Sequence, residues 1–386
     1  MKLLKDILYG CRILELKGQT NTAIERIQFD SRKVTKLNCF VAIAGLQSDG
    51  HHYIESAIEK GAVAVVCERF PETLSDQVTY VRVDNSAAAL GCMAANFYDN
   101  PSNKMTVVGV TGTNGKTTVA TLLYELFTQL GHKTGLISTV ENKINRVTVA
   151  ATHTTPDALS IQSLLADMHK AGCSHVFMEV SSHAVDQKRI QGIHFNGAIF
   201  TNLSHDHLDY HKTFAAYLKA KQQFFDQLPV ESFALTNVDD SNGEVMVQNT
   251  RAKRYTYAVR RPADYKVKVV ENQLSGLHLE INNQEIHCRL IGKFNAYNLG
   301  AIYGAAILLG KDPLQVLTTL SLMAPVNGRF QYLKTPAGIT VIIDYAHTPD
   351  ALENVLKTIE ETRTKNEQVF TLVGCGGDRD KTKRPE

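Results

Sequence analysis

The sequence predicts an α/β protein with more than one domain, and three observations support this. Short apolar segments alternate with longer segments of helical periodicity, the pattern of mostly parallel sheets covered by helices. One strand, residues 105–110, runs through a glycine-containing loop into a helix. At 386 residues, the chain also exceeds the size at which one core stops growing, roughly 250 to 300 residues.

Composition and charge argue against several classes of function. The chain is 44% hydrophobic and 21% charged, with a formal net charge of +2. Charge so close to balance gives no broad electrostatic footprint for nucleic acid, so we expect no nucleic-acid partner and only local anion sites. No segment reaches the roughly 18 uninterrupted apolar residues of a membrane span, and the N-terminus lacks the apolar core of a signal peptide. We expect no membrane partner.

The cysteines indicate a reducing compartment. Seven cysteines are scattered along the chain, odd in number and never in a C-x-x-C pair. This argues against a disulfide framework and against a structural zinc site. A cytoplasmic location is the expectation that follows.

The first predicted domain, residues 1–103, is a small α/β unit. Its end is marked by Asp, Asn, Pro and Ser residues clustered at 98–104. Before this cluster, apolar strands alternate with amphipathic helical runs. The strands are predicted at 39–45, 62–68 and 78–83, and a helix at 53–60.

The second predicted domain, residues 104–326, contains a mostly parallel sheet. Apolar strands at 105–110, 176–180, 197–202 and 233–237 are separated by helix-length segments. Residues 264–291 instead alternate apolar and polar positions around Asn and Gly turns. We expect an antiparallel meander there, as an insertion or an extra small sheet.

The third predicted domain, residues 327–386, is incomplete. A turn-rich boundary at 324–331 precedes a strand at 339–347, a helix at 351–361 and a strand at 368–375. One βαβ unit is too small to form a domain. We therefore expect the chain to stop inside its third domain.

The segment after the strand at 105–110 has the features of a phosphate-binding loop. Gly112 and Gly115 allow the backbone to wrap an anion at a helix N-terminus, Lys116 adds positive charge, and the Thr117 hydroxyl can reach a magnesium ion. The spacing departs from G-x-x-x-x-G-K-[ST], because position 110 is Val110. A glycine-rich turn without function is the alternative, and the Gly-Lys-Thr-Thr sequence before a helix favours an ATP or GTP loop.

Two later strands end in groups that can bind metal. Glu179 ends one strand, where parallel sheets collect their ligand sites, although such a carboxylate can also cap the next helix. A second group follows the next strand: His205, Asp206, His207, Asp209 and His211. Histidines alone suggest zinc, whereas Thr117 and a carboxylate favour magnesium at a nucleotide. On chemistry alone, Lys219 and Lys221 in the predicted helix at 214–228 read as solvated surface lysines.

Eight motifs in order along the chain resemble those of the Mur ligase family. They are TGTNGKTT, HTTP, MEVSSHAVDQKR, NLSHDHLDYHKTFAAYLKAKQ, GKFNAYN, NGRFQ, DYAHTPDAL and GCGGDRDKTKRP, spanning residues 111–385. The resemblance implies a three-domain Mur ligase architecture. Its parts are a UDP-sugar-binding N-terminal domain, a central ATP-binding domain with a P-loop ATPase-like parallel sheet, and an incomplete Rossmann-like third domain that binds the amino acid.

The resemblance also implies a reaction in peptidoglycan precursor synthesis. ATP phosphorylates the side-chain carboxylate of D-glutamate in UDP-N-acetylmuramoyl-L-alanyl-D-glutamate. The amine of meso-diaminopimelate, or alternatively of L-lysine, then displaces phosphate to form an amide. The family motif that selects between these two amino acids is expected beyond Arg379, outside this sequence. The implied cofactors are ATP and Mg²⁺, and a monomer is expected.

The resemblance assigns roles to individual residues. Implied catalytic residues are Lys116, Glu179, His207 and Lys221. Thr117, Glu179, His207 and a CO₂-carbamylated Lys221 are implied magnesium ligands. Implied nucleotide contacts are Gly112, Thr113, Asn114, Gly115, Lys116, Thr117, Thr118, Asn298, Arg329, Asp344 and His347. Implied contacts to the UDP-sugar peptide and the amino acid are Ser31, Gln47, Thr154, Thr155, Ser181, Gln187, Arg189 and Arg379.

Three alternatives stay open at this point. The chain can be another amide ligase of the same superfamily, such as the next Mur ligase or folylpolyglutamate synthase. It can be a nucleotide-dependent switch or kinase, for which a second metal site at Lys221 would have no use. It can also be an inactive fragment, in which case ATP and UDP-sugar binding persist with little turnover.

Overall fold

A computed structural model describes residues 1–45, 48–151, 153–364 and 366–374. The chain divides into two compact units. The first comprises Met1–Met105, Thr155–Gly172 and His183–His194, and the second comprises Thr106–Thr154, Cys173–Ser182 and Phe195–Glu386. The grouping of Thr155–Gly172 and His183–His194 with the N-terminal residues was not predicted from the sequence. The division into 1–103, 104–326 and 327–386 stays a prediction.

The first unit is built on a five-stranded sheet of order β2-β7-β6-β5-β4. The sheet is parallel except for β2, which pairs antiparallel with β7. The strands are β2 (Ile13–Lys17), β4 (Arg26–Gln28), β5 (Asn38–Val41), β6 (Ala62–Cys67) and β7 (Thr79–Val83), and β1 (Lys2–Leu3) pairs with β3 (Ala23–Ile24). The helices are α1 (Leu4–Ile7), η1 (Ser31–Lys33), η2 (Gly50–Tyr53), α2 (Ile54–Glu59), α3 (Ser86–Phe97), η3 (Pro101–Lys104) and α5 (Ala158–Lys170). The strands and the helix predicted for this unit are confirmed.

Both faces of this sheet are buried because side chains alternate along each strand. In β5, Cys39 and Val41 join one apolar cluster, whereas Phe40 joins the other. The first cluster includes α1 and α3, and the second includes α2. The apolar residues 39–41 are thus correctly predicted to lie in a strand that is buried on both faces.

The second unit contains an eleven-stranded sheet of order β11-β10-β9-β12-β8-β13-β14-β15-β16-β17-β18. Its strands are β8 (Thr106–Thr111), β9 (Thr134–Ile137), β10 (Glu141–Ile144), β11 (Val147–Ala150), β12 (His175–Glu179), β13 (Gly197–Phe200), β14 (Phe233–Asn237), β15 (Lys253–Ala258), β16 (Tyr265–Gln273), β17 (Gly276–Ile281) and β18 (Gln284–Cys288). Neighbours from β9 to β16 pair parallel, which confirms the predicted parallel sheet.

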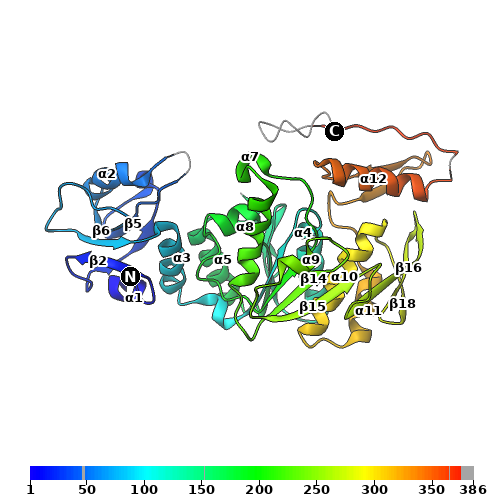
Figure 1. Cartoon of the computed structure of the whole chain (residues 1–386), viewed down its shortest axis with the longest axis horizontal. Coiled ribbons are helices and arrows are strands. Elements are labelled where there is room, and N and C mark those ends of the chain that lie inside the picture. Colours follow the sequence, from blue (N-terminus) through cyan, green and yellow to red (C-terminus); the bar gives the residue numbers. More distant parts are fainter. Residues whose placement is uncertain (46–47, 152, 365, 375–386) are drawn as a thin grey trace. The chain divides into compact units, whose positions relative to one another are not determined.

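Helices accompany these strands. They are α4 (Lys116–Gln129), α6 (Ser182–Asp186), α7 (Leu208–His211), α8 (Phe214–Asp226), α9 (Gly243–Met246), α10 (Lys293–Leu308) and α11 (Pro313–Leu322). α6 begins in the second unit at Ser182 and continues into the first. Figure 1 shows α10 and α11 beside the strands from β14 to β18.

The predicted meander at 264–291 exists as β16, β17 and β18, which pair antiparallel. It is not a separate small sheet, because β16 also pairs with β15 and so extends the central sheet. Only Tyr257 with Tyr265 and Ala258 with Lys266 make this junction. Because so few residues form this junction, the sequence pattern is the same whether the meander joins the central sheet or stands alone.

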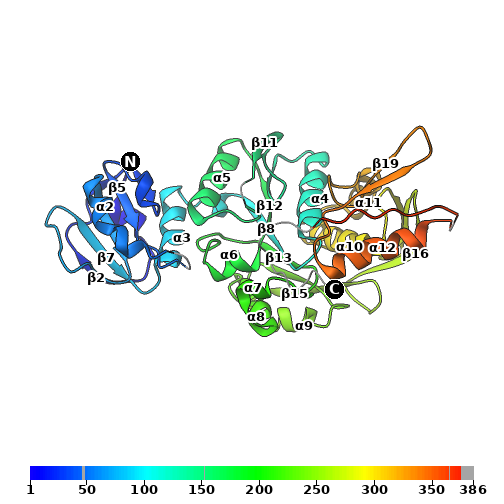
Figure 2. The ribbon, with the colours of Figure 1, turned by 90° about the horizontal axis from the view of Figure 1, so that it is seen from above.

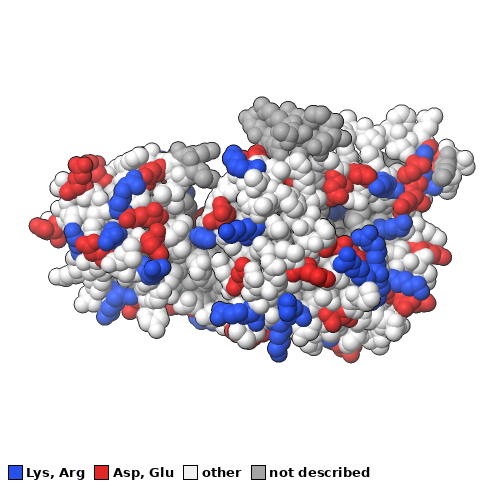
Figure 3. All heavy atoms as spheres, viewed as in Figure 1, with Lys and Arg blue, Asp and Glu red and all other residues white. Residues whose placement is uncertain are grey.

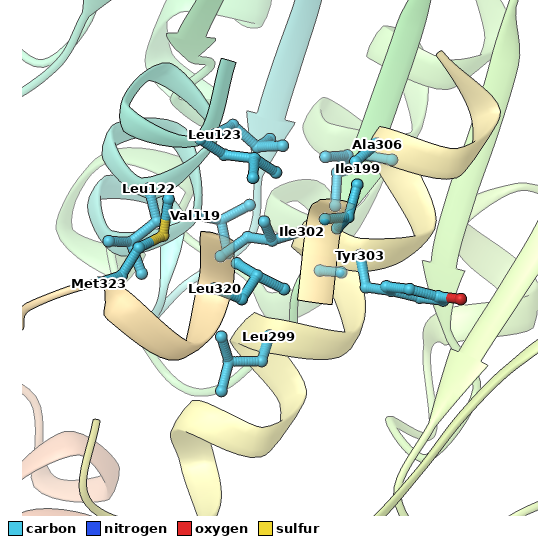
Figure 4. Packing of buried hydrophobic residues seen from close by; sticks show 14 of the residues in the cluster. Val119, Leu122, Leu123, Ile199, Leu299, Ile302, Tyr303, Ala306, Leu320 and Met323 are labelled. Atoms are coloured by element: carbon cyan, nitrogen blue, oxygen red, sulfur yellow. The ribbon is translucent and has the colours of Figure 1, made fainter. Parts of the chain in front are cut away.

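Helices α4 and α10 pack against the sheet in a single apolar cluster. Figure 4 shows Val119 of α4 beside Ile302 of α10, and Leu122 beside Met323. These side chains are at most 1% exposed. Burying each contributes roughly 1.5 to 3 kcal/mol, so the packing holds the start of α4 firmly at the end of β8.

Residues 327–374 differ from the prediction in two places. A hairpin of β19 (Gln331–Lys334) and β20 (Thr340–Ile343) precedes α12 (Pro349–Thr362), and β19 was not predicted. The strand predicted at 368–375 is wrong for 368–374, which form no strand. An apolar segment needs a neighbouring strand to satisfy its backbone, and none of the described strands pairs with it. Phe370 and Leu372 are accordingly 88% and 101% exposed.

Surface features add two observations. Within the described ranges, no helix combines the length and the apolar character needed to cross a bilayer. On the face shown in Figure 3, Lys and Arg side chains are interspersed with Asp and Glu.

Candidate active site

The loop between β8 and α4 lies at the topological switch point of the central sheet, where the order of the strands reverses. Figure 2 shows β12, β8 and β13 side by side. From β8 the chain crosses to β9 on one side, and from β13 it crosses to β14 on the other. The carboxyl ends of β8 and β13 thus border the crevice in which sheets of this kind bind ligands.

Two glycines in this loop are in backbone conformations where any other residue would be strained. Gly112 has φ 150° and Gly115 has φ 86°, values that other residues rarely adopt. A Cβ on Gly112 would collide with the Thr201 hydroxyl, and one on Gly115 would lie 2.6 Å from Oδ1 of Asn298. The loop is therefore a backbone cradle at the N-terminus of α4, as predicted for an anion site.

The loop after β13 holds this cradle in place. Asn202 accepts the Thr113 N–H at its carbonyl oxygen, 2.8 Å, and the Asn114 N–H at its side-chain oxygen, 2.9 Å. The Thr201 hydroxyl donates to the Asn114 carbonyl at 2.7 Å, and the Ser204 N–H donates to the Thr113 hydroxyl at 3.0 Å. These bonds rigidify the loop before any ligand arrives.

Lys116 turns its amine into the loop. Its Nζ donates to the carbonyl oxygens of Gly112, 3.0 Å, and Thr113, 2.7 Å. Burial lowers the pKa of Lys116, and Arg329 adds to this, whereas the carboxylates of Glu179 and Asp206 oppose it. The nearby acids therefore favour the ammonium form that a phosphate would need.

Lys221 shares a partner with Lys116. Its side chain, 1% exposed on α8, donates from Nζ to the Gly112 carbonyl at 2.8 Å. Burial lowers the pKa of Lys221 well below its ordinary value, and the charge of Lys116 lowers it further, against a smaller opposing effect of Asp206. This lysine is thus poised to lose its proton, which the sequence pattern alone did not indicate.

Tyr217 joins Lys221 to the histidine-rich loop. The Lys221 Nζ lies 4.8 Å from the centre of the Tyr217 ring, and the ring of His207 lies 6.0 Å from it. The Tyr217 hydroxyl contacts the Thr113 hydroxyl at 3.1 Å. Tyr217 is buried on the same helix face as Lys221, four positions away. Tyr217 was not predicted as a site residue, although its helical spacing from Lys221 is a usable signal.

The five polar residues of the histidine-rich loop differ in their burial and in their contacts. His205 and Asp209 are exposed, whereas Asp206 is buried and its carboxylate lies 3.3 Å from Nε2 of His207. His211 is buried, and its Nε2 contacts the Ser182 hydroxyl at 2.9 Å. The five therefore do not point to one centre.

Glu179 contacts the turn after β9. Its carboxylate, 1% exposed, accepts the Thr139 N–H at 2.7 Å and the Thr139 hydroxyl at 3.2 Å. The Thr139 hydroxyl also contacts the Thr154 hydroxyl at 3.1 Å, so Thr139 links two predicted site residues. Thr139 was not singled out from the sequence, because no local motif marks it.

The predicted nucleotide contacts come from three separate segments. Arg329 donates from Nη2 to the Thr117 hydroxyl at 3.0 Å, and its guanidinium lies 4.7 Å from the Tyr345 ring. The Asp344 carboxylate accepts the N–H groups of Phe330 and Ala346, which orders the turn carrying Arg329. His347 contacts the Tyr345 carbonyl at 3.0 Å. Arg329 and Thr117 are thus brought together over 212 positions of sequence.

Three polar atoms around the loop are left for a ligand. Within the described chain, Thr111 Oγ1, Ser204 Oγ and Arg329 Nε are buried without a hydrogen-bond partner. Buried polar atoms almost always have partners, so such a group at one place suggests an absent polar molecule. Together with the glycine cradle, these atoms fit a polyphosphate with its cation.

The predicted magnesium ligands combine side chains of several types. Among the residues that the structure describes, no three His, Cys, Asp or Glu side chains gather as a metal site. The predicted set, Thr117, Glu179, His207 and Lys221, contains just two residues of those types. Oxygen donors with one imidazole suit Mg²⁺, provided that Lys221 carries a carboxylate.

The predicted substrate contacts fall in both units. In the first, Arg189 donates to the Thr155 carbonyl at 2.9 Å and to the Gln187 side chain at 2.6 Å, so these three lie together. Ser31 begins η1, and its carbonyl accepts from Lys60. Thr154 and Ser181 belong to the second unit. Gln47 and Arg379 lie outside the described residues.

Fold and site together define an α/β nucleotide-binding protein with a phosphate loop and a buried second lysine. Comparison with known proteins is more specific. Residues 23–98 match "Mur ligase family, catalytic domain", residues 110–306 match "Mur ligase middle domain", and residues 328–386 match "Mur ligase, glutamate ligase domain". The chain belongs to the Mur ligase family.

Individual relatives are similar over nearly the whole chain. The UDP-N-acetylmuramoyl-L-alanyl-D-glutamate–2,6-diaminopimelate ligase of Cytophaga hutchinsonii is 56% identical over 99% of this chain and 79% of its own length. The enzyme of that name from Parabacteroides distasonis is 54% identical, with the same coverage. A solved structure with that name matches 100% of this chain and 79% of its own, with TM-score 0.80 and 30% identity.

Proposed function

We propose that this chain is an ATP-dependent ligase that joins meso-diaminopimelate to UDP-N-acetylmuramoyl-L-alanyl-D-glutamate, forming ADP and phosphate. Mur ligases are ATP-dependent acid–amino-acid ligases of peptidoglycan synthesis, and relatives at 56% and 54% identity carry the name of this reaction. The observation that carries the proposal is the arrangement of Lys116 and Lys221, which donate to one carbonyl of a glycine cradle. A loop that served only as a turn would need neither lysine.

The nucleotide is proposed to bind along the loop and the segment after it. Gly112, Thr113, Asn114, Gly115, Lys116, Thr117 and Thr118 would receive the phosphates through backbone N–H groups, the Lys116 ammonium and hydroxyls. Asn298, Arg329, Asp344 and His347 would contact the rest of the nucleotide. Arg329 is well suited, because its guanidinium already lies at Thr117 and retains a buried donor.

Magnesium would offset the negative charge that collects on the phosphates during transfer. Thr117 is proposed to hold one ion, and Glu179, His207 and Lys221 another. In the structure, Thr139 fixes the Glu179 carboxylate, and Asp206 lies beside the His207 ring. Such partners orient ligands before a cation binds.

Lys221 is proposed to act as a carbamate. A neutral amine attacks CO₂, a C–N bond forms, one proton leaves, and the product is a carboxylate on the side chain. Burial and the neighbouring Lys116 favour the neutral amine that this step requires. The carbamate nitrogen keeps one N–H, which can still donate to Gly112.

The chemistry follows from the weakness of a carboxylate as an electrophile. Phosphoryl transfer to the D-glutamate side chain creates a good leaving group on its carbonyl carbon. The diaminopimelate amine then forms a C–N bond as the C–O bond to phosphate breaks. Lys116 and Arg329 would stabilise the charge on the transferred group, and the buried site would exclude water that competes with the amine.

Substrate recognition is proposed to use residues of both units. Ser31 and Gln47 would contact the uridine part, and Thr154, Thr155, Ser181, Gln187 and Arg189 the muramoyl peptide. Arg189 already holds Gln187 and Thr155 in one group, as a preformed contact surface requires. Arg379 would bind the carboxylate of the incoming amino acid. We also propose a cytoplasmic location, which the scattered cysteines favour, and a monomer, as the family resemblance implies.

An amino-acid panel tests the proposal. The chain, extended to the length of its relatives, is assayed for ADP and phosphate release with the UDP-linked dipeptide and each of several amino acids. Release that depends on both the dipeptide and meso-diaminopimelate supports the proposal. A preference for L-lysine or a dipeptide would assign another acceptor, and ADP release without any acceptor would indicate a switch or kinase.

A further inference from the structure

Two cysteine side chains of the first unit face each other. Cys11 follows α1, Cys92 lies in α3, and their Sγ atoms are 2.8 Å apart, with the Cys11 thiol donating to Cys92. Both residues are partly exposed, whereas Cys39, Cys67, Cys173 and Cys288 are buried. The pair is thus set apart from the other described cysteines by proximity and by access.

Neighbouring contacts hold the two thiols in this arrangement. The Asn96 amide, one turn after Cys92, donates to the carbonyls of Ile7 at 2.9 Å and Tyr9 at 2.6 Å. The Cys92 thiol also points to the Tyr9 carbonyl at 3.6 Å. The segment carrying Cys11 is therefore tied to α3 independently of the thiols, and their approach is built into the fold.

We propose that Cys11 and Cys92 are a reversible oxidation site that forms an intramolecular disulfide with hydrogen peroxide. One thiolate attacks peroxide, giving a sulfenic acid and hydroxide. The second sulfur then attacks this sulfur, an S–S bond forms, and water leaves. Over both steps, two thiols are oxidised, and one peroxide is reduced to two waters. A thiol reductant reverses the reaction.

The hydrogen bond between the thiols assigns their order of reaction. It lowers the pKa of Cys92 and, together with burial, raises that of Cys11. Cys92 is therefore the residue that peroxide attacks, and Cys11 is the residue that resolves the sulfenic acid. In a reducing compartment such a disulfide would form transiently, as redox-sensing disulfides do.

The disulfide would connect residues 81 positions apart. It would fix the segment after α1 to α3, and it would restrict the unfolded chain. A loop of this size predicts a rise in the unfolding temperature of the first unit on the order of 15 °C. The inference does not rest on ligase activity, so its test is independent of the proposed function.

The test uses purified protein in which Cys375, outside the described residues, is replaced by Ser. The protein is treated with a small excess of hydrogen peroxide and digested without reduction. We expect a peptide pair joined through Cys11 and Cys92, loss of two hydrogen atoms from the intact mass, and full reversal by dithiothreitol. Cys11→Ser should instead accumulate a sulfenic acid at Cys92, trapped by dimedone. Cys39→Ser serves as the matched control and should still form the disulfide.

Two results would overturn the proposal. One is peroxide treatment that leaves Cys11 and Cys92 as free thiols while other cysteines react. The other is oxidation of each of the two to separate acids, without a joined peptide. Unfolding temperature gives a second measurement, because only the protein with both cysteines should show the oxidant-dependent rise.

Discussion

Strand β12 carries a cluster of ionisable side chains at each end, and the two clusters differ in what surrounds them. At its amino end, the His175 ring lies 4.8 Å from the His132 ring, and the Lys311 amine contacts His132 at 2.8 Å. At its carboxyl end, Glu179 and Lys116 belong to the candidate active site. Both clusters contain basic groups, but among the described residues acids act only on the lysine of the second cluster.

The two clusters differ in the neighbours that shift their pKa values. Burial, then His132 and Lys311, lower the pKa of His175 to about 4. The pKa of Lys311 is lowered by burial as well. At the carboxyl end, Glu179 opposes the lowering of the Lys116 pKa. At the amino end His175 is therefore neutral at pH 7, whereas at the carboxyl end the acids favour the ammonium form of Lys116 that a phosphate can use.

The largest predicted effect is at Lys116. In Lys116→Ala the loop keeps its backbone but loses its ammonium, so the ligase rate should fall by about 10³-fold. Lys170→Ala, on the exposed face of α5, is the matched control and should retain the wild-type rate. Steady-state ADP release measures both. A Lys116→Ala enzyme within a factor of a few of wild type would place the phosphates elsewhere.

Lys221 should come next. Lys221→Ala removes the proposed carbamate, and we expect a loss of about 10²-fold together with loss of any dependence on bicarbonate. Lys219→Ala is the control, because Lys219 is exposed two positions earlier on the same helix. Activity in CO₂-depleted buffer, with and without added bicarbonate, is the measurement. Equal losses in the two variants would remove the distinction between these lysines.

Arg329 should show a smaller effect. Arg329→Lys keeps the charge but loses the planar fork that reaches Thr117, so we predict about a tenfold rise in the dissociation constant for an ATP analogue. Isothermal titration with a non-hydrolysable analogue measures this. Lys334→Arg, in the exposed part of β19, should leave binding unchanged, and an unaltered affinity for Arg329→Lys would argue that the arginine only packs on Tyr345.

The smallest effect is expected at the amino end of β12, on stability alone. Because the folded-state pKa of His175 lies below its ordinary value of 6.5, the unfolded chain binds more protons between about pH 6.5 and 4. Stability is complete above this window and is lost as pH falls through it. His175→Phe should therefore reduce the acid loss by about 1 kcal/mol, a figure discounted for the partial exposure of the ring.

Urea unfolding at pH 7 and pH 5 measures the effect of His175→Phe. The exposed His169→Gln is the control and should follow wild type. If His175→Phe and wild type lose stability equally between these pH values, the neutral form inferred for His175 is wrong. Ligase activity should be the same in both proteins, since this end of the strand takes no part in the reaction.

The candidate active site at the carboxyl end of β12 could be predicted from sequence more easily than the individual contacts within it. Gly112, Gly115 and Lys116 sit in one contiguous motif between a strand and a helix, so local sequence suffices. Local sequence does not identify Lys221. It differs from exposed Lys219 only in lying on the buried face of α8, with Tyr217 and Phe224. The buried face of this helix could be predicted from the spacing of its apolar residues, but a lysine is rarely found on a buried face.

Pairing between distant segments was the least predictable part. The meander joins the central sheet through two residue pairs, which lie between β15 and β16. The strand predicted at 368–375 had the right apolar composition, yet strand formation depends on a neighbour that composition does not reveal. The contact of Arg329 with Thr117 likewise arises from tertiary packing, and only the family resemblance suggested it.

The most direct test of the account follows oxygen from the substrate into phosphate. The D-glutamate side-chain carboxylate of the UDP-linked dipeptide is labelled with ¹⁸O, and the ligase is run to completion with ATP and meso-diaminopimelate. The account predicts one labelled oxygen in each phosphate released, because the carboxylate attacks the phosphoryl group and the amine then expels it. Phosphate without label, formed at the same rate as the amide, would contradict it.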